Sequence, residues 1–371
     1  MRVIVTGGGT GGHIYPALAI ADKCKEMDPS GEILYVGNDE GIEKDIVPKA
    51  GYRLELVDAR WLNKSSVWQL VRTGVRVTKG ILEASRVIRR FKPDVIIGTG
   101  GYVCFPVIVA GKLYGARTFL HEQNAYPGLA NRSLERYVDK VFLGFADAAK
   151  YFKQPEKMVE AGNPVRKRFF TLTKAEARKK LGFAADDFIV FSFGGSLGAE
   201  KINEVAFELM QVLNGHEKTM MIFGTGKWYY QQMLDQAAAR GIVIRENILI
   251  KDYIEDMEYY LAACDLVISR AGALSVAETT VCGKAAILIP SPNVTGNHQY
   301  YNAKAVADRG GAILLEEKEL TAEILISEVM KLKNNPALTA AMGQASRACA
   351  PVKALDIIYD TICSTLAQRQ R

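Results

Sequence analysis

The stretch Arg2-Val-Ile-Val-Thr-Gly-Gly-Gly-Thr-Gly-Gly-His-Ile-Tyr-Pro16 decides the fold at the start of this chain. Its apolar run, Val3 to Val5, predicts a short buried parallel strand, and the residues from Pro16 to Met27 carry apolar side chains at helical spacing. A glycine turn therefore opens a helix. Glycine lets a ligand approach the backbone, and the first N–H groups of a helix lack partners, so this turn predicts a site for a phosphate group.

His13 stands at the end of the glycine turn and is one of four histidines in 371 residues. One interpretation is a helix-start residue that is hydrogen-bonded to the loop. The other is a functional base, which the position inside a glycine turn favours.

The same turn also fits the dinucleotide pattern Gly7-x-Gly9-x-x-Gly12, with Asp39 beyond a second strand as the acid that would bind ribose. Consecutive glycines match many such templates by chance, so the pattern has low specificity. It keeps an NAD(P)- or flavin-dependent oxidoreductase as an alternative.

Composition limits the class of protein. A chain of 371 residues exceeds what one hydrophobic core usually holds, and 49% hydrophobic residues are enough for two cores. The six cysteines contain no C-x-x-C pair and indicate reduced thiols of the cytosol, and the first residues do not resemble a signal peptide. The net charge of +6 is too small to argue for nucleic acid as a partner.

Strand-like runs alternate with helical patterns in the first half, which predicts a parallel sheet covered by helices. The predicted strands are Arg2–Thr6, Glu32–Gly37, Asp94–Gly98, Thr118–His121 and Lys140–Leu143. Ligands of such sheets bind beyond the carboxyl ends of the strands, where the loops here are Gly7–His13, Gly98–Tyr102 and His121–Asn124. His121 and Asn124 are candidates for this site, or polar groups that are satisfied at the end of a strand.

Residues 60–92 have a different character. They contain nine Lys or Arg and one acid, Glu83, for a net charge of +8, and apolar residues such as Trp61, Trp68 and Leu82 are interleaved with the cations. This composition is typical of a surface that rests on anionic lipid headgroups. A helix that packs on the core with a solvated basic face would have it too. RNA binding would use the same charge, but no stacking-aromatic motif accompanies it.

The second half repeats this organisation after a turn-rich linker, Glu160–Arg166. A strand at Asp187–Phe193 leads into the glycine turn Gly194–Ala199 and a helix from Lys201 to Leu213, which predicts a second anion site at a helix N-terminus. Further predicted strands are Thr219–Phe223, Ile248–Lys251, Asp265–Ser269 and Ala285–Ile289. Glu278 falls in the first turns of a helix, where a carboxylate either caps N–H groups or accepts hydrogen bonds from ribose.

The predicted fold class is therefore α/β, with two Rossmann-like, doubly wound parallel-sheet domains that face a cleft. The expected domains are residues 1–162 and residues 163–350. The helical segment 351–371 is expected to pack back on the first domain as a closing helix.

Seven motifs in this order resemble the MurG family of bacterial peptidoglycan N-acetylglucosaminyltransferases, which have the two-domain GT-B fold, and the resemblance runs the length of the chain. The motifs are Gly7-Gly-Gly-Thr-Gly-Gly-His13, Gly98-Thr-Gly-Gly-Tyr102, His121-Glu-Gln-Asn124, Gly162-Asn-Pro-Val-Arg166, Gly194-Gly-Ser-Leu-Gly-Ala199, Ser269-Arg-Ala-Gly-Ala-Leu-Ser-Val-Ala-Glu278 and Asn297-His-Gln299. The resemblance implies inverting transfer of N-acetylglucosamine from UDP-N-acetylglucosamine to the 4-hydroxyl of undecaprenyl-diphosphate-linked muramyl pentapeptide, with no metal and no cofactor.

The resemblance also implies roles for individual residues. In the second domain, Ser196 and Arg166 would hold the diphosphate, Ile254 would meet uracil through its backbone, and Glu278 would bind the ribose. The donor sugar and its phosphates would be surrounded by Asn124, Ala273, Leu274, Ser275, Val276, Ala277, Glu278 and Gln299. In the first domain, Thr10, Gly11 and Gly12 would stand at the edge that faces the other domain. Where many relatives have two adjacent glutamines, this chain has His298-Gln299, so only Gln299 carries over.

The implied reaction agrees with the residues. Inversion needs a general base for the acceptor hydroxyl, and His13 is the best-placed base, because the positive end of a helix keeps an imidazole neutral. No Asp-x-Asp pair occurs in the sequence, so helix N-termini and Arg166 would carry the charge of the departing diphosphate. An acceptor anchored in a bilayer implies a peripheral enzyme at the cytoplasmic face of the plasma membrane, which favours the lipid-surface interpretation of residues 60–92.

Overall fold

The computed structural model describes residues 1–39, 41–59, 67–195 and 197–368, without the side chains of 67–76 and 295. The chain forms two compact units: residues 1–165 with 351–371, and residues 166–350. The boundary therefore lies three residues after the expected one at 162/163. Asn163 explains the difference, because its buried side chain donates a hydrogen bond to the carbonyl oxygen of Gln123 and keeps the segment in unit 1.

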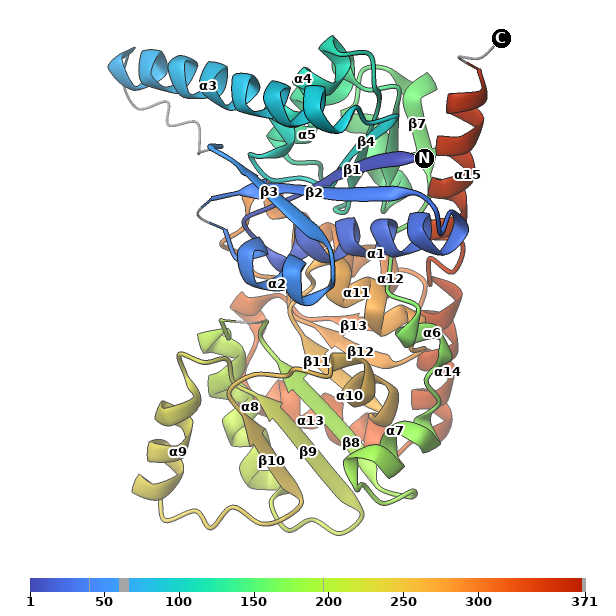
Figure 1. Cartoon of the computed structure of the whole chain (residues 1–371). Helices are drawn as coiled ribbons and strands as arrows, with labels where there is room; N and C mark the ends of the chain where they lie inside the picture. The colour runs from blue at the N-terminus through green and yellow to red at the C-terminus, as the bar shows by residue number, and fades with distance from the viewer. Residues whose placement is uncertain (40, 60–66, 196, 369–371) are drawn as a thin grey trace. The chain divides into compact units, whose positions relative to one another are not determined.

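Unit 1 is built on a seven-stranded parallel sheet (Figure 1). Its strands are β1 (Arg2–Thr6), β2 (Glu32–Asn38), β3 (Arg53–Val57), β4 (Val95–Gly98), β5 (Arg117–Glu122), β6 (Lys140–Leu143) and β7 (Met158–Glu160). They lie in the order β3-β2-β1-β4-β5-β6-β7, and Ile4 of β1 pairs with Leu34 on one side and Ile96 on the other. The strand order reverses between β1 and β4, the place where doubly wound sheets bind ligands.

Helices cover both faces of this sheet. They are α1 (Gly11–Met27), α2 (Glu43–Lys49), α3 (Val67–Phe91), α4 (Cys104–Leu113), α5 (Leu129–Leu134) and α15 (Ala354–Ala367), with short 3₁₀ helices at Glu135–Tyr137, Ala146–Tyr151 and Pro155–Lys157. One face packs on α1 and α15, and the other packs on α3 and α4 (Figure 1). Neighbouring residues of β1 alternate between the two cores, as the two-residue period of a strand requires.

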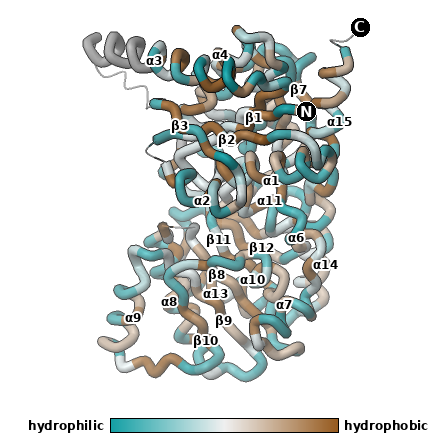
Figure 2. The backbone as a smooth tube through the Cα atoms, in the orientation of Figure 1, coloured by the Kyte–Doolittle hydropathy of each residue, from teal (hydrophilic) through white to brown (hydrophobic). Residues whose placement is uncertain are grey.

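Helix α3 shows how residues 77–91 combine burial with charge. Ala84, Val87, Ile88 and Phe91 are buried at the spacing of one helix face, whereas the arginines between them are exposed. Figure 2 shows the resulting alternation of hydrophobic and hydrophilic residues along the coloured part of α3.

Unit 2 has a six-stranded parallel sheet in the order β10-β9-β8-β11-β12-β13. The strands are β8 (Phe188–Phe193), β9 (Thr219–Gly224), β10 (Ile248–Lys251), β11 (Leu266–Ser269), β12 (Ala285–Leu288) and β13 (Ala312–Leu314). The helices are α6 (Arg168–Thr171), α7 (Lys174–Leu181), α8 (Glu200–Leu213), α9 (Tyr230–Ala239), α10 (Met257–Ala263), α11 (Ala273–Val281), α12 (His298–Ala307), α13 (Ala322–Lys333) and α14 (Pro336–Ala348), with 3₁₀ helices at Thr295–Asn297 and Glu317–Glu319. The strand order reverses between β8 and β11.

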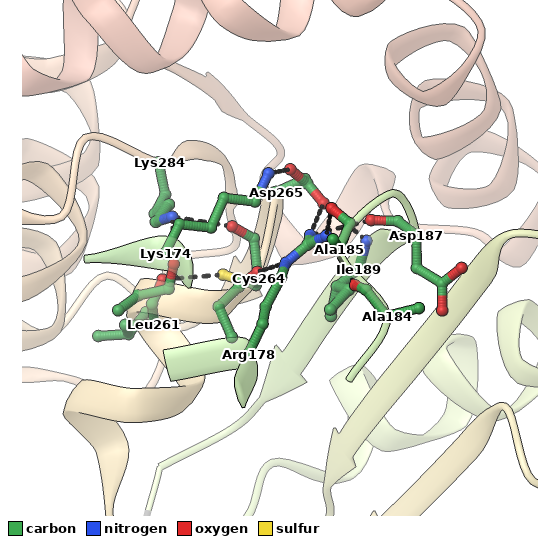
Figure 3. Close-up of polar contacts among 12 residues, drawn as sticks. Lys174, Arg178, Ala184, Ala185, Asp187, Ile189, Leu261, Cys264, Asp265 and Lys284 are labelled. Atoms are coloured by element: carbon green, nitrogen blue, oxygen red, sulfur yellow. Dashed lines mark hydrogen bonds and ion pairs between the residues drawn. The ribbon is translucent and has the colours of Figure 1, made fainter. Parts of the chain in front are cut away.

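A buried ionic network fixes the amino-terminal end of β11 (Figure 3). The guanidinium of Arg178 pairs with Asp265 at 2.8 Å and donates to carbonyl oxygens of residues 184, 185, 187 and 263. Asp265 also pairs with Lys174 and accepts from the backbone of Ile189. These hydrogen bonds and ion pairs join the start of β11 to neighbouring segments of unit 2. The network lies at the end of the sheet opposite the carboxyl ends of the strands, where ligands bind.

Candidate functional site

In unit 1 the glycine turn Gly7–Thr10 connects β1 to α1 at the reversal of strand order. Helix α1 begins at Gly11, five residues before the expected start at Pro16, because His13 and Ile14 already donate their backbone N–H groups to the carbonyl oxygen of Thr10. Gly11 and Gly12 therefore precede the first hydrogen-bonded N–H group of the helix, at the end where N–H groups point outward. The predicted anion site is a helix N-terminus, as the sequence indicates.

The loop after β4 fits closely against this turn and needs glycine to do so. Gly101 has φ +86°, and a Cβ atom there would lie 2.5 Å from the carbonyl oxygen of Gly8. Gly100 has φ +114°, and its Cβ would lie 2.9 Å from Nε2 of His13. The absence of a side chain at Gly100 therefore leaves the space that the imidazole of His13 occupies, and its absence at Gly101 lets the two loops come into backbone contact.

A hydrogen bond orients the ring of His13. Its Nδ1 lies 3.0 Å from the carbonyl oxygen of Gly8, and the hydroxyl of Thr10 lies 3.5 Å from the same nitrogen. A carbonyl oxygen only accepts, so this contact assigns the proton to Nδ1 and leaves the lone pair of the neutral ring on Nε2. The ring is thus held in the tautomer that a base acting through Nε2 requires.

The loop after β5 has a structural role at His121 and Gln123. His121 is fully buried, its Nε2 lies 2.9 Å from the carbonyl oxygen of Gly162, and burial lowers its pKa to about 4. Gln123 donates to the carbonyl oxygen of Thr99 and to Nδ1 of His121. Of the two interpretations of His121, the structure therefore supports a polar group that is satisfied at a strand end.

Asn124 follows these residues and is half-buried. Its backbone and side-chain amides both donate to the buried carboxyl of Glu122, whose pKa is raised by burial. The loop that carries Asn124 is thereby fixed beside β4, one strand away from the glycine turn.

In unit 2 the corresponding turn, Gly194–Ala199, connects β8 to α8, which begins at Glu200. Ser196 lies outside the described residues. Gly198 has φ +86°, and a Cβ atom there would lie 2.2 Å from the carbonyl oxygen of Thr225 in the loop after β9. Ile254, which follows β10, packs over Gly224 at the end of β9. The loops after β8 and β9 are therefore in backbone contact at the carboxyl end of this sheet, and the loop after β10 packs there through the side chain of Ile254.

Helix α11 starts on the other side of the strand-order reversal and carries six of the predicted residues, Ala273 to Glu278. Ala273, Val276 and Ala277 are buried, whereas Leu274, Ser275 and Glu278 keep part of their surface exposed. The helix has no acidic residue in its first turn, so its positive end is not neutralised there. Only the three partly exposed residues can offer side-chain atoms to a ligand.

Glu278 lies in a cluster of three charged groups. Burial raises its pKa to about 7, the nearby charge of Arg166 lowers it, and Glu258 of α10 raises it. Arg166, the first residue of unit 2, pairs with Glu258 at 3.3 Å and lies over the ring of Phe169. The structure thus brings the two predicted residues Arg166 and Glu278 together and adds Glu258, which the sequence motifs did not indicate.

The start of α12 completes this end of the sheet. Gln299 accepts a hydrogen bond from the backbone N–H of Ser291 at 2.9 Å, and Asn302 donates to the carbonyl oxygen of Ala271. Arg270, which also escaped prediction, donates to the carbonyl oxygens of residues 289 and 290 and pairs with Glu317. These contacts fix the loops after β11 and β12 beside the N-terminus of α11.

The described part of the chain was compared with the requirements of a metal site and of a membrane-spanning helix. No group of three or more His, Cys, Asp or Glu side chains in it is arranged to hold a metal ion. None of its helices combines the length and hydrophobicity that a membrane-spanning segment needs.

Both halves of the chain match models of one protein family. Residues 3–143 match the glycosyltransferase family 28 N-terminal domain, and residues 189–357 match the family 28 C-terminal domain.

Relatives match over the full length. The chain is 42% identical, over all of both chains, to an Alkaliphilus oremlandii protein named UDP-N-acetylglucosamine–N-acetylmuramyl-(pentapeptide) pyrophosphoryl-undecaprenol N-acetylglucosamine transferase. A Bacillus cereus protein of the same name, numbered 1, is 43% identical over 89% of each chain. The crystal structure of MurG from Acinetobacter baumannii aligns with a TM-score of 0.74 at 26% identity, over 97% of this chain and 99% of that one.

Proposed function

This chain belongs to glycosyltransferase family 28, and on that premise we propose that it transfers N-acetylglucosamine from UDP-N-acetylglucosamine to undecaprenyl-diphosphate-linked N-acetylmuramyl pentapeptide in peptidoglycan synthesis. The observation that carries the proposal is the full-length similarity to a curated relative with that name, at 42% identity. Both family matches are to glycosyltransferase domains, which disfavours the oxidoreductase with Asp39 as its ribose acid.

Unit 2 is proposed to bind the donor. The N-termini of α8 and α11 flank the reversal of strand order, where unpaired N–H groups and the helix dipoles favour a diphosphate. Arg166 adds a full positive charge, and the carboxylate of Glu278 accepts hydrogen bonds from the ribose hydroxyls. Ser196 with Arg166 would hold the phosphates, Ile254 would meet the uracil, and Leu274, Ser275, Gln299 and Asn124 would contact the sugar.

Unit 1 is proposed to bind the acceptor and to supply the base. Thr10, Gly11 and Gly12 offer the N-terminus of α1 to the diphosphate of the acceptor. The 4-hydroxyl oxygen of the acceptor attacks the anomeric carbon, the bond from that carbon to the phosphate oxygen breaks, and UDP leaves with the electron pair. Nε2 of His13 takes the hydroxyl proton, so the reaction inverts the anomeric centre in one displacement.

The departing UDP carries negative charge, which the helix N-termini and Arg166 stabilise without a metal in this proposal. A transfer assay with a short-chain lipid acceptor, run with and without a chelator, tests the activity and this point together. We expect sugar transfer at the same rate in both. Loss of activity in chelator that Mg²⁺ restores would contradict the metal-free mechanism, and no transfer to the lipid acceptor would contradict the function.

The lipid-linked acceptor requires contact with a membrane surface, which we assign to residues 60–92, at the cytoplasmic face. Part of this segment, 60–66, lies outside the described residues. In the described side chains, Leu82 is 56% exposed and shares a helix face with exposed Arg86 and Arg89. Arg89 also lies over the ring of Tyr114, a half-exposed aromatic residue after α4. Exposed apolar residues beside arginines are what an anionic lipid surface binds.

Part of the +8 charge of residues 60–92 is neutralised within the protein and cannot attract anionic lipid. Lys79 pairs with Asp58 at 3.0 Å, and Arg90 pairs with Glu55 at 2.7 Å, so two acids outside the segment neutralise two of its cations. Arg86 and Arg89 form no such pair with a carboxylate of the described chain and are the strongest candidates for lipid contact.

Neutralising Arg72, Arg76, Lys79, Arg86 and Arg89 to glutamine is expected to weaken binding to anionic vesicles by more than about 100-fold. Lys79 is already paired with Asp58, but each of the other four cations contributes about 1 kcal/mol near such a surface. Vesicle flotation measures the loss. The matched control neutralises five cations of unit 2, Lys179, Lys180, Lys218, Lys318 and Lys331, and should leave binding within about twofold of the wild type. Equal losses in the two variants would mean that only the net charge matters, and the assignment to residues 60–92 would fail.

A further inference from the structure

A carboxylate is buried beneath the glycine turn of unit 1. Glu43, the first residue of α2, has no exposed surface, and its two oxygens accept hydrogen bonds from different backbone groups. Oε1 accepts from the N–H of Asn38 at 2.9 Å, and Oε2 accepts from the N–H of Gly9 at 3.2 Å. Both contacts use the carboxylate as an acceptor, which suits its ionised form.

Three glycines provide the space for this carboxylate. A Cβ atom at Gly8 would lie 2.4 Å from Oε1, one at Gly41 would lie 2.0 Å from Oε2, and one at Gly37 would lie 2.8 Å from Cγ. Side chains at these positions would displace Glu43. The glycine turn is therefore shaped around an acid, although a phosphate site would be expected to avoid one.

The hydrogen bond from Gly9 connects Glu43 to His13 through a single peptide group. The N–H of Gly9 and the carbonyl of Gly8 belong to the same planar unit and point in opposite directions. On one side this peptide donates to Glu43 at 3.2 Å, and on the other it accepts from Nδ1 of His13 at 3.0 Å. A third bond, from the N–H of Gly8 to the carbonyl oxygen of Gly100, holds the preceding peptide at 3.3 Å.

We propose that Glu43 is a positioning residue for the transfer reaction, acting on His13 through the Gly8–Gly9 peptide. This inference rests on the proposed role of His13 as the base. The carboxylate fixes the orientation of the peptide, so the carbonyl oxygen of Gly8 faces Nδ1 and selects the tautomer with the lone pair on Nε2. It also polarises the peptide, which makes that oxygen a better acceptor for the imidazolium that forms when His13 takes the hydroxyl proton.

Glu43 itself transfers no proton in this arrangement. The proton of the acceptor hydroxyl resides on Nε2 of His13, and the bond from Nδ1 to Gly8 shortens as the ring becomes positive. The buried negative charge stabilises that state across the peptide, much as a carboxylate does when it contacts a histidine directly.

The test compares Glu43→Gln with Glu135→Gln in the full chain. Glu135 is also a buried carboxyl of unit 1 that accepts two backbone hydrogen bonds, from residues 153 and 154, but it lies in the 3₁₀ helix Glu135–Tyr137, which packs against α4 and α5. Glu43→Gln is expected to lower kcat about 10- to 100-fold, as losses of supporting contacts to a functional histidine do. The KM for UDP-N-acetylglucosamine should stay within about threefold, because the donor binds to unit 2.

Glu135→Gln should leave kcat within about threefold of the wild type. Equal effects of the two substitutions on kcat would overturn the proposal, since a purely structural role predicts them. If Glu43→Gln does not fold, Glu43→Asp is tested in its place. The aspartate keeps the charge but withdraws the carboxylate by one methylene, and we expect the same decrease in kcat.

Two further measurements separate this inference from the proposed function. In a His13→Ala background, Glu43→Gln should lower kcat by no more than about twofold, because the two residues act as a unit. If His13→Ala alone leaves turnover intact, the proposed base is wrong. If His13→Ala lowers turnover and Glu43→Gln still has its full effect in that background, only the connection through the peptide is wrong.

The tautomer can also be read directly in ¹⁵N-histidine-labelled protein, which has only four histidines to assign. Long-range ¹H–¹⁵N correlation should show the Nδ1–H form of His13 in the wild type and a mixture of forms in Glu43→Gln. The signals of buried His121 serve as an internal reference. An unchanged His13 spectrum in Glu43→Gln would overturn the proposal without any assay of activity.

Discussion

Replacing His13 with alanine is expected to lower turnover by about 10²- to 10⁴-fold, the usual contribution of a general base, while binding of UDP-N-acetylglucosamine stays unchanged. The reason is that the groups proposed to bind the donor, apart from Asn124, lie in residues 166–350, whereas the imidazole lies at the start of α1. Single-turnover kinetics with a lipid acceptor measure the loss, and calorimetry with the donor measures the binding.

His216→Ala is the matched control for this substitution, because His216 is exposed in unit 2 and follows α8 rather than a glycine turn. It should retain full turnover. A His13→Ala variant that keeps wild-type turnover would remove His13 as the base. If the chain were a non-catalytic nucleotide-sugar-binding module, His13→Ala would leave its function intact.

Replacing Glu278 with alanine is expected to weaken binding of UDP-N-acetylglucosamine by more than about 100-fold. One carboxylate that accepts hydrogen bonds from two ribose hydroxyls gives two charge-assisted bonds, each worth roughly 1.5–3 kcal/mol. Calorimetry measures the affinity. Thr280→Ala, on the same helix but with its hydroxyl bonded to Ala277, is the control and should bind the donor as the wild type does.

The raised pKa of Glu278, about 7, makes donor affinity depend on pH. The ionised carboxylate binds the hydroxyls, so the affinity should fall about tenfold between pH 8 and pH 6, as the carboxyl takes up a proton. The intact donor is the probe, because its phosphates are diesters and do not titrate in this range as the terminal phosphate of UDP does. Glu278→Gln should flatten the profile, and an unchanged profile in that variant would assign the pH dependence to another group.

The raised pKa of Glu278 also predicts that Glu278→Gln stabilises the folded protein, although the same substitution weakens donor binding. Between about pH 4.5 and 7 the folded protein binds a proton that the unfolded chain releases, so this carboxyl destabilises the fold increasingly as pH rises through that range. The glutamine variant should therefore melt at a higher temperature than the wild type at pH 8 and lose the advantage near pH 4.5. If Glu278→Gln both raises the melting temperature and lowers the donor affinity, Glu278 is a residue whose burial destabilises the protein but serves ligand binding.

The sequence predicted the inner strands of both sheets and the edge strand β10, but not the other three edge strands, β3, β7 and β13. Inner parallel strands are buried on both faces and form continuous apolar runs, such as the four residues of β4. In β3 the sequence Arg-Leu-Glu-Leu-Val mixes charges with apolar residues, because one edge of the strand meets solvent. β3 therefore lacks the continuous apolar run on which the prediction depended, whereas the edge strand β10 has three consecutive apolar residues and was predicted.

The positions of candidate site residues could be predicted where a motif fixes them locally, but not where a partner comes from a distant element. The turn before α1 places His13 by itself, whereas Glu43 reaches Gly9 from 34 positions away, through the fold of β2 and α2. Glu258 approaches Glu278 in the same way, from α10. The helix boundary at Gly11 was also missed, since glycine has a low helix propensity and only the contacts of Thr10 with residues 13 and 14 override it.

Unit 1 is discontinuous, and this determines the order in which the chain can fold during synthesis. Ile358 and Ile362 of α15 are buried in the same core as β1 and α1, so that core is incomplete until the ribosome has made nearly the whole chain. Unit 2 is a single uninterrupted stretch, residues 166–350, and can close its own core first. The earliest residues to emerge are thus among the last to be fully buried, and the apolar strand β1 stays partly exposed to solvent during that interval.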